Sequence, residues 1–479
     1  MKKSAAICYM AIGMVICLVP FAGMTAFRTD TTTENKTLAS FPEFVTDGSV
    51  NLDFFDELSE YFEDHFAFRE ALVNADAEIQ SNIFQVSNVD TIITGENGWL
   101  YYSATLDDYL GQNLMSDRAI YNAAYNLALT QEYVESMGAQ FAVTVAPNKN
   151  TLYGENMPYY DSYIVSEEKN ADNLAAELVN QDVTYIDLFS AFESQDETLY
   201  LKRDSHWNTK GAVLAYNEIL GGMGIEHDLL ETVTALRTNT EIGDLNTMIY
   251  PLTSQPEWNY EYQYESTYSY VTDTESVEDA WIETENSEGE GSLLMFRDSF
   301  GNTLLPLMAN TFSEAYFTKS VPYKLGEYME TYSPETVIIE KVERNVDEFA
   351  TNPPLVQTLE TELTVEAESA EDLTTCAVGE SENDISYLSI DGVLDETTAS
   401  ENGEVYIRLT VGENTKTFPA FLVSSDESDF GYQFYLSKDS LAVLASDGTT
   451  TMDVEVITVS GDDAAVVKTV SVDVAEYLQ

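Results

Sequence analysis

The sequence predicts an α/β protein that is followed by a small all-β domain, and three observations support this. Between residues 117 and about 350, amphipathic helical segments alternate with short apolar runs. This alternation is typical of a mostly parallel sheet with helices on both faces. Beyond residue 356, alternating runs such as EVYIRLTV and MDVEVITVS are separated by turn residues, which favours a β-sandwich. At the other end of the chain, an uncharged apolar run from Ser4 to Phe27 precedes the folded part.

The apolar run is long enough to cross a bilayer as a helix, with Lys2 and Lys3 on the cytoplasmic side. A cleaved signal peptide is the alternative. The run is longer than a usual signal core, and Met24-Thr25-Ala26 is a poor cleavage pattern. We therefore interpret residues 1–28 as a membrane anchor or signal peptide and prefer the anchor. With either, the rest of the chain is expected outside the cytoplasm.

Residues 29–116 are expected to contain a linker and then a helical and hairpin part. The segment TDTTTENKTLASFPEF is a polar spacer. The next segment predicts a long amphipathic helix, broken near Phe66, because apolar residues recur at helical spacing: Phe54, Phe55, Leu58, Phe62 and Phe66. The segment TIITGENGWLYYS predicts a hairpin, in which Gly95 and Gly98 mark the turn.

Residues 117–355 are expected to form the α/β domain. The pattern predicts a helix in DRAIYNAAYNLALTQEYVESMG, a strand at 141–147, a helix in DNLAAELVNQ and a strand at 183–189. A helix capped by Asn208 follows, with Ala212, Ala215, Tyr216 and Ile219 as its apolar stripe. The last elements are strand SLLMF, a helix from about Gly301, and strands EAYF and TVIIEKV.

Two further regions complete the predicted organisation. Residues 232–290 interrupt the α/β pattern with a tyrosine-rich, acidic insertion, which we interpret as a lid or a substrate-binding flap. Residues 356–479 form the β-sandwich-like domain. A spacer is the preferred interpretation of this domain, and a module for polymer or protein contact is the alternative.

Composition excludes several classes of function. The chain has 84 acidic and 21 basic residues and a formal net charge of −63, so nucleic-acid binding is not expected. Outside the first few residues it has no basic patch for an anionic membrane surface. The three cysteines (Cys8, Cys17 and Cys376) offer neither a disulfide framework nor a zinc pattern, and no Asp-rich calcium loop occurs. We therefore expect no metal and no cofactor.

A candidate nucleophile is Ser299, in SLLMFRDSFGNTLLPLMANTF, which we interpret as strand, sharp turn and helix. At such a turn the hydroxyl projects from the carboxyl end of the sheet. The N–H of the serine and those of the first helical turn are then expected to be free to stabilise an oxyanion. The flanking residues differ from the G-x-S-x-G pattern of other hydrolases.

A serine nucleophile needs a base, which is usually histidine. Of the three histidines, His65 is interpreted as a capping or packing group of the N-terminal helix, and His227 as an exposed loop residue. His206 follows Asp204 by two positions and precedes Trp207, which could shield the pair from water. In an extended segment positions 204 and 206 face the same way, so Asp204 could hold the imidazole for the serine. Spacing alone leaves a structural histidine as an equal alternative.

The segments D-S-H-W-N and R-D-S-F-G-N-T-L-L-P resemble the AlgX/AlgJ-type acetyltransferase family and its Gram-positive DHHW relatives. Further matches are TENKTLASFPEF, YFEDHFAFRE, GENGWLYY, VAPNKNTLY and VIIEKVERN, so the resemblance covers most of residues 33–350. It implies an SGNH-hydrolase-like three-layer α/β/α domain. Ser299 would be the nucleophile, His206 the base and Asp204 the orienting acid. Lys149, Arg344 and Trp207 are the candidate substrate-binding residues.

The sequence departs from the family pattern at one position. The first motif often reads D-H-H-W, and here Ser205 replaces the middle histidine. Its side chain is expected to point away from Asp204 and His206.

The resemblance implies acetyl transfer outside the membrane. A membrane-bound O-acyltransferase would supply the acetyl group, and a cell-surface or secreted polysaccharide would receive it through an acetyl-Ser299 intermediate. Because the protein is acidic, we expect a neutral or cationic glycan. Two alternatives stay open: a carbohydrate acetyl esterase, in which water replaces the glycan, and a non-catalytic glycan-binding or scaffold protein of a surface-polymer assembly.

Overall fold

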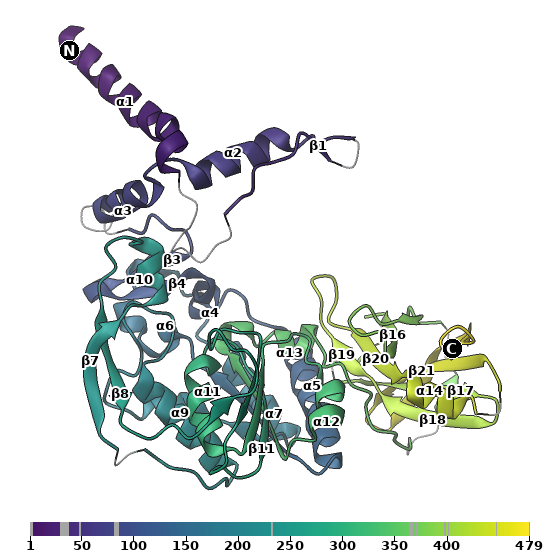
Figure 1. Cartoon of the computed structure of the whole chain (residues 1–479). Coiled ribbons are helices and arrows are strands. Elements are labelled where there is room, and N and C mark those ends of the chain that lie inside the picture. The colour runs from purple at the N-terminus through teal and green to yellow at the C-terminus, as the bar shows by residue number, and fades with distance from the viewer. Residues whose placement is uncertain are drawn as a thin grey trace.

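The computed structural model describes residues 3–28, 38–46, 49–80, 86–230, 233–363, 367–369, 372–396, 399–400, 402–446 and 448–478. An α/β body lies between an N-terminal helical part and a C-terminal β domain (Figure 1). Residues 29–37 of the predicted polar spacer lie outside the described residues.

A seven-stranded sheet forms the centre of the α/β body. Its order is β6 (Tyr185–Ile186), β5 (Gln140–Ala146), β13 (Thr336–Val342), β11 (Ser292–Phe296), β12 (Glu314–Thr318), β10 (Trp281–Glu285) and β9 (Ser269–Tyr270). The strands from β6 to β12 are parallel, and β10 and β9 are antiparallel to their neighbours. Every residue of β13 is buried, as expected for a central parallel strand that is covered on both faces.

Helices cover both faces of this sheet, so the predicted α/β architecture is confirmed. Phe141, Val143 and Leu294 point to the face covered by α5 (Asp117–Ser136), α7 (Asn170–Asn180) and α12 (Leu325–Tyr332). Their neighbours Ala142 and Leu293 point to the opposite face, which is covered by α8 (Leu188–Glu193), α9 (Thr209–Gly222) and α11 (Gly301–Thr311). The short helices α4 (Leu106–Leu110), α6 (Lys149–Leu152) and α13 (Glu348–Thr351) lie in connecting segments.

Two predictions for the α/β region need correction. The predicted strand at 183–189 is too long: β6 has two residues, and α8 begins at Leu188 because the Asp187 side chain accepts a hydrogen bond from the Ser190 N–H. The insertion at 232–290 is not a separate flap, because β9 and β10 extend the central sheet. The insertion also contains the antiparallel pair β7 (Ala235–Glu241) and β8 (Glu257–Tyr262), and the helix α10 (Asp244–Ile249) between them.

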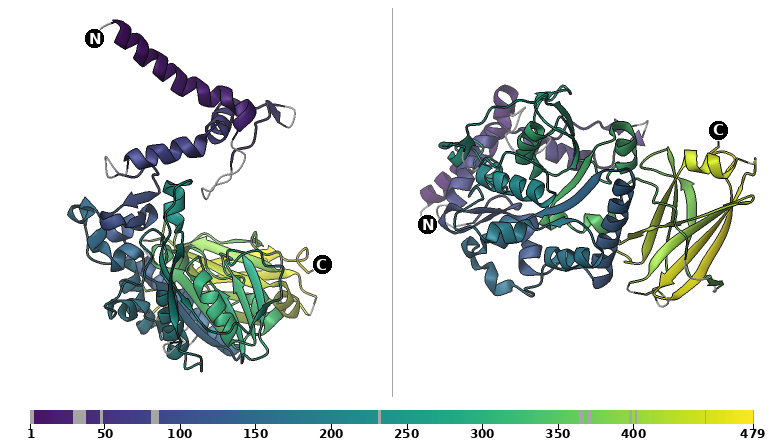
Figure 2. Two further views of the ribbon diagram at one scale, coloured as in Figure 1. Left: turned by 60° about the vertical axis from the view of Figure 1, so that its left-hand side comes forward. Right: turned by 90° about the horizontal axis from the view of Figure 1, so that it is seen from below.

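The N-terminal part contains α1 (Lys3–Phe27), the strand pair β1 (Val45–Thr46) and β2 (Ser49–Val50), α2 (Phe54–His65) and α3 (Arg69–Ile79). The predicted break near Phe66 is confirmed: it separates α2 from α3, and Phe68 has a φ of 62°. In Figure 2, α1 projects away from the α/β body. Among the residues that the structure describes, no helix is long and apolar enough to cross a membrane, so the predicted membrane helix is unsupported.

The predicted hairpin is formed by β3 (Ile92–Thr94) and β4 (Leu100–Tyr102), which pair antiparallel. Asn97 and Gly98 have φ angles of 55° and 79° in the turn between them, a conformation that these two residue types tolerate.

The C-terminal domain consists of two sheets, in agreement with the predicted sandwich. One has the order β14 (Glu368–Ser369), β22 (Asp463–Asp473), β21 (Thr451–Ser460), β17 (Glu404–Val411) and β18 (Asn414–Pro419). The other has the order β15 (Ala377–Glu380), β16 (Tyr387–Val393), β20 (Gly431–Ser437) and β19 (Phe421–Val423), and α14 (Lys438–Leu444) follows β20.

The sandwich packs against α5 (Figure 2, right). Buried Asn126 of α5 donates to the carbonyls of Phe349 and Leu422 and accepts from the Leu422 N–H at 2.9 Å. Hydrophobic residues of the sandwich and of α5 belong to one continuous core. The β domain is thus fixed to the α/β body by buried contacts and not only by the connecting chain.

Candidate active site

Ser299 lies in the turn between β11 and α11, at the carboxyl edge of the central sheet. The preceding Asp298 holds this turn: its carboxylate accepts from the Phe300 N–H at 2.8 Å and from the Val342 N–H at 2.7 Å. Gly301 is required by close packing, because a Cβ at this position would lie 2.6 Å from the Arg297 Cβ. The turn is therefore tied to the end of the neighbouring strand β13, which fixes the position of the serine hydroxyl.

His206 and Asp204 lie beside this hydroxyl. The His206 Nε2 is 2.8 Å from the Ser299 Oγ, and its Nδ1 is 2.8 Å from an Asp204 carboxylate oxygen. The same carboxylate accepts from the His206 N–H, and its other oxygen accepts from the Asp244 N–H, each at 2.9 Å. The three residues that the sequence singled out thus have the geometry of a Ser-His-Asp arrangement.

The electrostatics of the pair match this geometry. Burial disfavours the imidazolium of His206, but the hydrogen bond to Asp204 and the nearby carboxylates outweigh burial and raise the pKa of His206. Burial also acts to raise the pKa of Asp204, but the hydrogen bond and charge of His206 and two backbone N–H groups lower it overall. Asp204 is accordingly ionised at neutral pH and stabilises a proton on the imidazole.

Asp244, at the start of α10, is a site residue that sequence reasoning missed. Its carboxylate accepts from the Ser205 hydroxyl at 2.5 Å and from the Ser205 N–H at 2.8 Å. The Ser205 Oγ is also 3.2 Å from the His206 Nδ1, so the expectation that this side chain points away from His206 is wrong. Burial, and then the charge of Asp204, raise the pKa of Asp244. The only signal in the sequence is an acidic residue after Gly243 in the insertion.

The Lys149 side chain contacts the backbone of the loop that carries His206. Its side chain is 4% exposed, and its ammonium donates to the carbonyls of Leu201, Lys202 and Asp204 at 3.1, 3.1 and 2.5 Å. Burial lowers its pKa to about 8, against the opposing carboxylates. The three N–H donors of an ammonium are all used here. This arrangement supports a positioning role, and the substrate contact predicted for Lys149 stays a prediction.

The other two candidate substrate-binding residues lie in different surroundings. Trp207 is 1% exposed, packs against Phe300 and donates its indole N–H to the Thr303 hydroxyl at 2.5 Å. It therefore joins the His206 loop to α11. Arg344 is half-buried after β13, with its guanidinium 5.4 Å from the centre of the Tyr102 ring. Substrate contacts by Trp207 and Arg344 stay predictions.

The N–H of Ser299 donates to no residue that the structure describes, so it is available to an oxyanion, as predicted. The expectation for the rest of the first helical turn needs correction. The Phe300 N–H donates to Asp298, and the Asn302 N–H donates to the Ser299 carbonyl at 3.2 Å. The predicted oxyanion site is thus smaller than a fully free helical turn.

The carboxylates also raise the question of a metal. One ligand atom each of Asp204, His206 and Asp244 lies within 4.8 Å of the others. The carboxylate oxygens of this cluster accept hydrogen bonds from N–H and O–H groups, and the free ring nitrogen of His206 contacts Ser299. A hydrogen-bonded proton relay accounts for these contacts without a metal.

The other two histidines, His65 and His227, lie away from Ser299. His65 is buried and stacks on Tyr61, as predicted for a packing group. His227 is half-buried and packs edge-on against Tyr216, so the prediction of an exposed loop residue is wrong. It lines a cavity of about 500 Å³ near the start of β11, at the sheet edge opposite Ser299.

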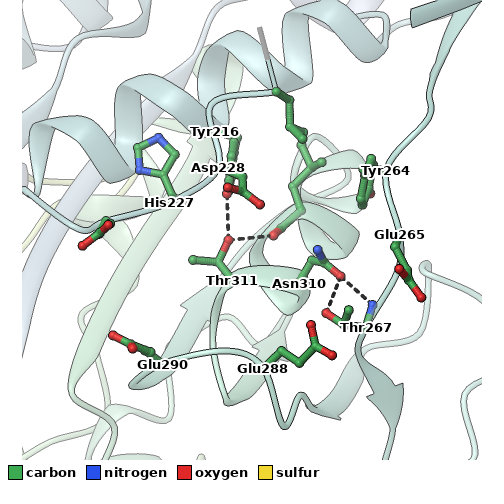
Figure 3. Close-up of a pocket in the computed structure, with 13 residues that line it drawn as sticks. Tyr216, His227, Asp228, Tyr264, Glu265, Thr267, Glu288, Glu290, Asn310 and Thr311 are labelled. Atoms are coloured by element: carbon green, nitrogen blue, oxygen red, sulfur yellow. Dashed lines mark hydrogen bonds between the residues drawn. The ribbon is translucent and has the colours of Figure 1, made fainter. Parts of the chain in front are cut away.

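Figure 3 shows this cavity, whose wall carries five carboxylates: Glu226, Asp228, Glu265, Glu288 and Glu290. Tyr216 and Thr311 share a hydrogen bond of 2.7 Å on its wall. None of its lining residues belongs to the Ser299 site.

The chain was compared with known proteins. Residues 92–288 match the family model of an SGNH hydrolase-like domain, acetyltransferase AlgX. The matched region contains Lys149, Asp204, His206 and Asp244 and ends before Ser299. The predicted family resemblance is thereby confirmed. No curated protein sequence matches the chain.

Several solved structures resemble part of the chain at low sequence identity. A DHHW family protein from Eubacterium siraeum is 18% identical, covers 47% of this chain and 85% of its own length, and has a TM-score of 0.38. Bacillus cereus PatB1, solved with a sulfonyl adduct, is 16% identical, with coverages of 55% and 98% and a TM-score of 0.43. The O-acetyltransferase domain of Pseudomonas putida AlgJ is 16% identical, with coverages of 53% and 92% and a TM-score of 0.37.

Proposed function

Because the chain carries an SGNH hydrolase-like domain of the AlgX acetyltransferase family, we propose that it is an O-acetyltransferase that modifies a polysaccharide outside the cytoplasm. The observation that carries the proposal is the continuous hydrogen-bonded path from Ser299 through His206 to Asp204. A hydroxyl at 2.8 Å from an imidazole nitrogen is within reach for direct proton transfer.

In the first half-reaction, the Ser299 Oγ attacks the carbonyl carbon of an acetyl ester. The proton of the hydroxyl passes to the His206 Nε2, and the Ser299 N–H donates to the developing oxyanion. When the tetrahedral intermediate collapses, the bond to the donor oxygen breaks, and His206 returns the proton to the departing alcohol. The products are acetyl-Ser299 and the free donor alcohol.

In the second half-reaction, a glycan hydroxyl attacks acetyl-Ser299. His206 removes the proton of this hydroxyl, and the same proton restores the Ser299 hydroxyl when the acyl bond to serine breaks. Asp204 keeps the His206 Nδ1–H oriented and stabilises the imidazolium in both halves. Water in place of the glycan would give acetate, which is the esterase alternative.

The location and the donor belong to the same proposal. An extracytoplasmic location rests on the apolar segment from Ser4 to Phe27. A membrane-bound O-acyltransferase partner is the proposed source of acetyl groups. Protease accessibility of the β domain in intact cells tests the location, because a cytoplasmic β domain would be protected.

The deciding experiment treats the purified full-length protein with 4-nitrophenyl acetate and searches for an acetyl group on the peptide that contains Ser299. The adduct should form in the wild type and in the control Ser194→Ala, which changes an exposed serine. It should be absent in Ser299→Ala and strongly reduced in His206→Ala. An unmodified Ser299 peptide and no ester turnover would refute the proposal and favour the non-catalytic scaffold. Addition of a glycan then separates the two enzymatic functions, because only a transferase gives acetylated glycan in place of acetate.

A further inference from the structure

A second cavity, of about 870 Å³, is lined in part by Arg203 of the loop that carries His206. It is formed by the turn of the β3–β4 hairpin, the segment around Tyr159 and the residues that follow α10. Its volume falls in the range of small-molecule and oligomer sites. Its wall includes Glu78, Glu96, Tyr159, Arg203 and Tyr250.

The cavity is connected to the candidate active site through the backbone. Arg203, on the cavity wall, directly precedes Asp204. The Leu100 N–H of the hairpin donates to the Lys202 carbonyl at 2.8 Å, and the Asn246 N–H of α10 donates to the Arg203 carbonyl at 3.0 Å. The hairpin wall is thus fixed to the loop that carries His206.

The two sites are also close enough for one extended ligand. The helix α10 begins with Asp244 at the active site, and Tyr250 at its far end lines the cavity. A helix of six residues is about 9 Å long. A polymer strand in the cavity could therefore reach Ser299 with a neighbouring unit.

The side chains of the wall match a sugar. A pyranose has faces of C–H groups, which pack on aromatic rings, and a rim of hydroxyls, which exchange hydrogen bonds. Tyr159 is 67% exposed and stacks on Tyr160, so its ring forms part of an aromatic platform. The Arg203 guanidinium has no hydrogen bond or ion pair with a described residue. This guanidinium is available to the hydroxyls of a ligand.

The charge of the wall selects against an anionic polymer. Glu78 and Glu96 line the cavity together with Arg203. A uronate strand would meet more negative than positive charge here, whereas a neutral strand needs no charge partner.

We propose that this cavity is the acceptor groove of the enzyme and binds a neutral, uncharged segment of the polysaccharide. This inference rests on the proposed function, because it gives the acetyl-Ser299 intermediate its acceptor. The groove is tested by binding and not by turnover, so that the groove and the proposed transferase function can fail separately.

The experiment measures binding of fluorescent oligosaccharides to full-length Ser299→Ala protein. The array contains neutral hexose, pentose and N-acetylhexosamine oligomers, with uronate and glucosamine oligomers as charged comparisons. At least one neutral oligomer should bind saturably and more tightly than any charged one. A second substitution in the Ser299→Ala protein, either Tyr159→Ala or Arg203→Ala, should weaken this binding at least tenfold. Tyr270→Ala should not, because Tyr270 is 41% exposed on β9 and does not line the cavity.

Three outcomes would overturn the groove: no binding of any neutral oligomer, a preference for uronate or glucosamine oligomers, or equal loss of affinity in Tyr270→Ala. Each of these is independent of the acetyl adduct on Ser299. A failed adduct with intact glycan binding would instead refute the transferase and leave a glycan-binding protein.

Discussion

Replacement of Lys149 by Met distinguishes positioning from substrate binding at this residue. Methionine keeps the length and apolar stem of lysine but removes the ammonium. The ammonium binds three carbonyls. Those of Leu201 and Asp204 are buried and would lose this hydrogen-bond donor, whereas the Lys202 carbonyl lies nearer the surface. An unsatisfied buried polar group costs about 1–3 kcal/mol, so the loss of stability should be about 2–6 kcal/mol.

The same change should lower catalysis through kcat. The freed carbonyls belong to the loop that holds His206 and Asp204, and a shift of about 1 Å in a catalytic group lowers the rate about 100-fold. We therefore expect Lys149→Met to lower kcat for 4-nitrophenyl acetate by about that factor and to leave KM nearly unchanged. A residue that only contacts substrate would show the opposite pattern, a higher KM with normal stability.

The assay combines ester kinetics with urea unfolding of the full-length protein. The matched control is Lys416→Met, which removes an exposed ion pair with Glu360 in the β domain. Such a pair contributes at most about 1 kcal/mol, and its loss should not alter kcat. A stability loss below about 1 kcal/mol in Lys149→Met, together with normal kcat, would refute the positioning role.

Four further predictions follow from the contacts of the described residues. Because its carboxylate partners raise the pKa of His206, Ser299 acylation should increase with pH and reach half its maximum above about 6.5, the ordinary histidine value. Asp244→Ala frees Ser205 and alters the support of the His206 loop, so kcat should fall about tenfold with little change in KM, as steady-state kinetics would show. Asn126→Ala leaves buried backbone groups between α5 and the sandwich without partners and should cost about 2–5 kcal/mol in urea unfolding. Burial raises the pKa of Glu340 well above its usual range, so the folded protein binds more protons than the unfolded chain above pH 4.5 and loses stability as pH rises. Glu340→Gln should remove this decrease of stability with pH, as measured by thermal unfolding between pH 4.5 and 8.

Each of these predictions has a contradicting result. A half-maximum at or below pH 6.5 would show that the carboxylates do not stabilise the imidazolium. An Asp244→Ala variant with wild-type kcat would remove this residue from the support of the loop. Asn180→Ala, an exposed residue on α7, is the control for Asn126→Ala, and equal stability losses in both would contradict the buried contact. An unchanged pH slope in Glu340→Gln would mean that the carboxyl is ionised in the folded protein.

Much of the fold followed from the sequence because local signals agree with long-range packing. The strands β5, β11 and β13 are mostly apolar, since they are buried on both faces, although β13 also carries Glu340 and Lys341. The Asn208 side chain caps α9 by accepting from the Gly211 N–H, as predicted. One exception is α8, where the apolar residues after Ile186 suggested a strand. Asp187 carried a capping signal that competed with this interpretation and determined the helix.

Two contacts that support the site, and that the sequence did not reveal, involve backbone groups. The Asp244 N–H donates to Asp204, forty positions away in the chain, and the Lys149 ammonium binds carbonyls more than fifty positions away. Backbone acceptors are the same in every residue, so no residue pattern marks them. By contrast, the contacts of Ser299, His206 and Asp204 join side chains of characteristic chemistry. These three could therefore be singled out together before any geometry was known.

The net charge of −63 does not by itself decide the chemistry at Ser299. Charges on the surface are screened over about 10 Å, whereas buried groups act directly on the reacting atoms. Behind the Ser299 turn, burial and the charge of Asp298 favour the neutral form of Glu340, and the buried Arg297 supplies a positive charge that is held by the carbonyls of Val277 and Asp279. The surroundings of the developing oxyanion are thus less negative than the composition suggests. For the same reason, the charges of the groove wall give a sharper basis for predicting the acceptor than the charge of the whole chain.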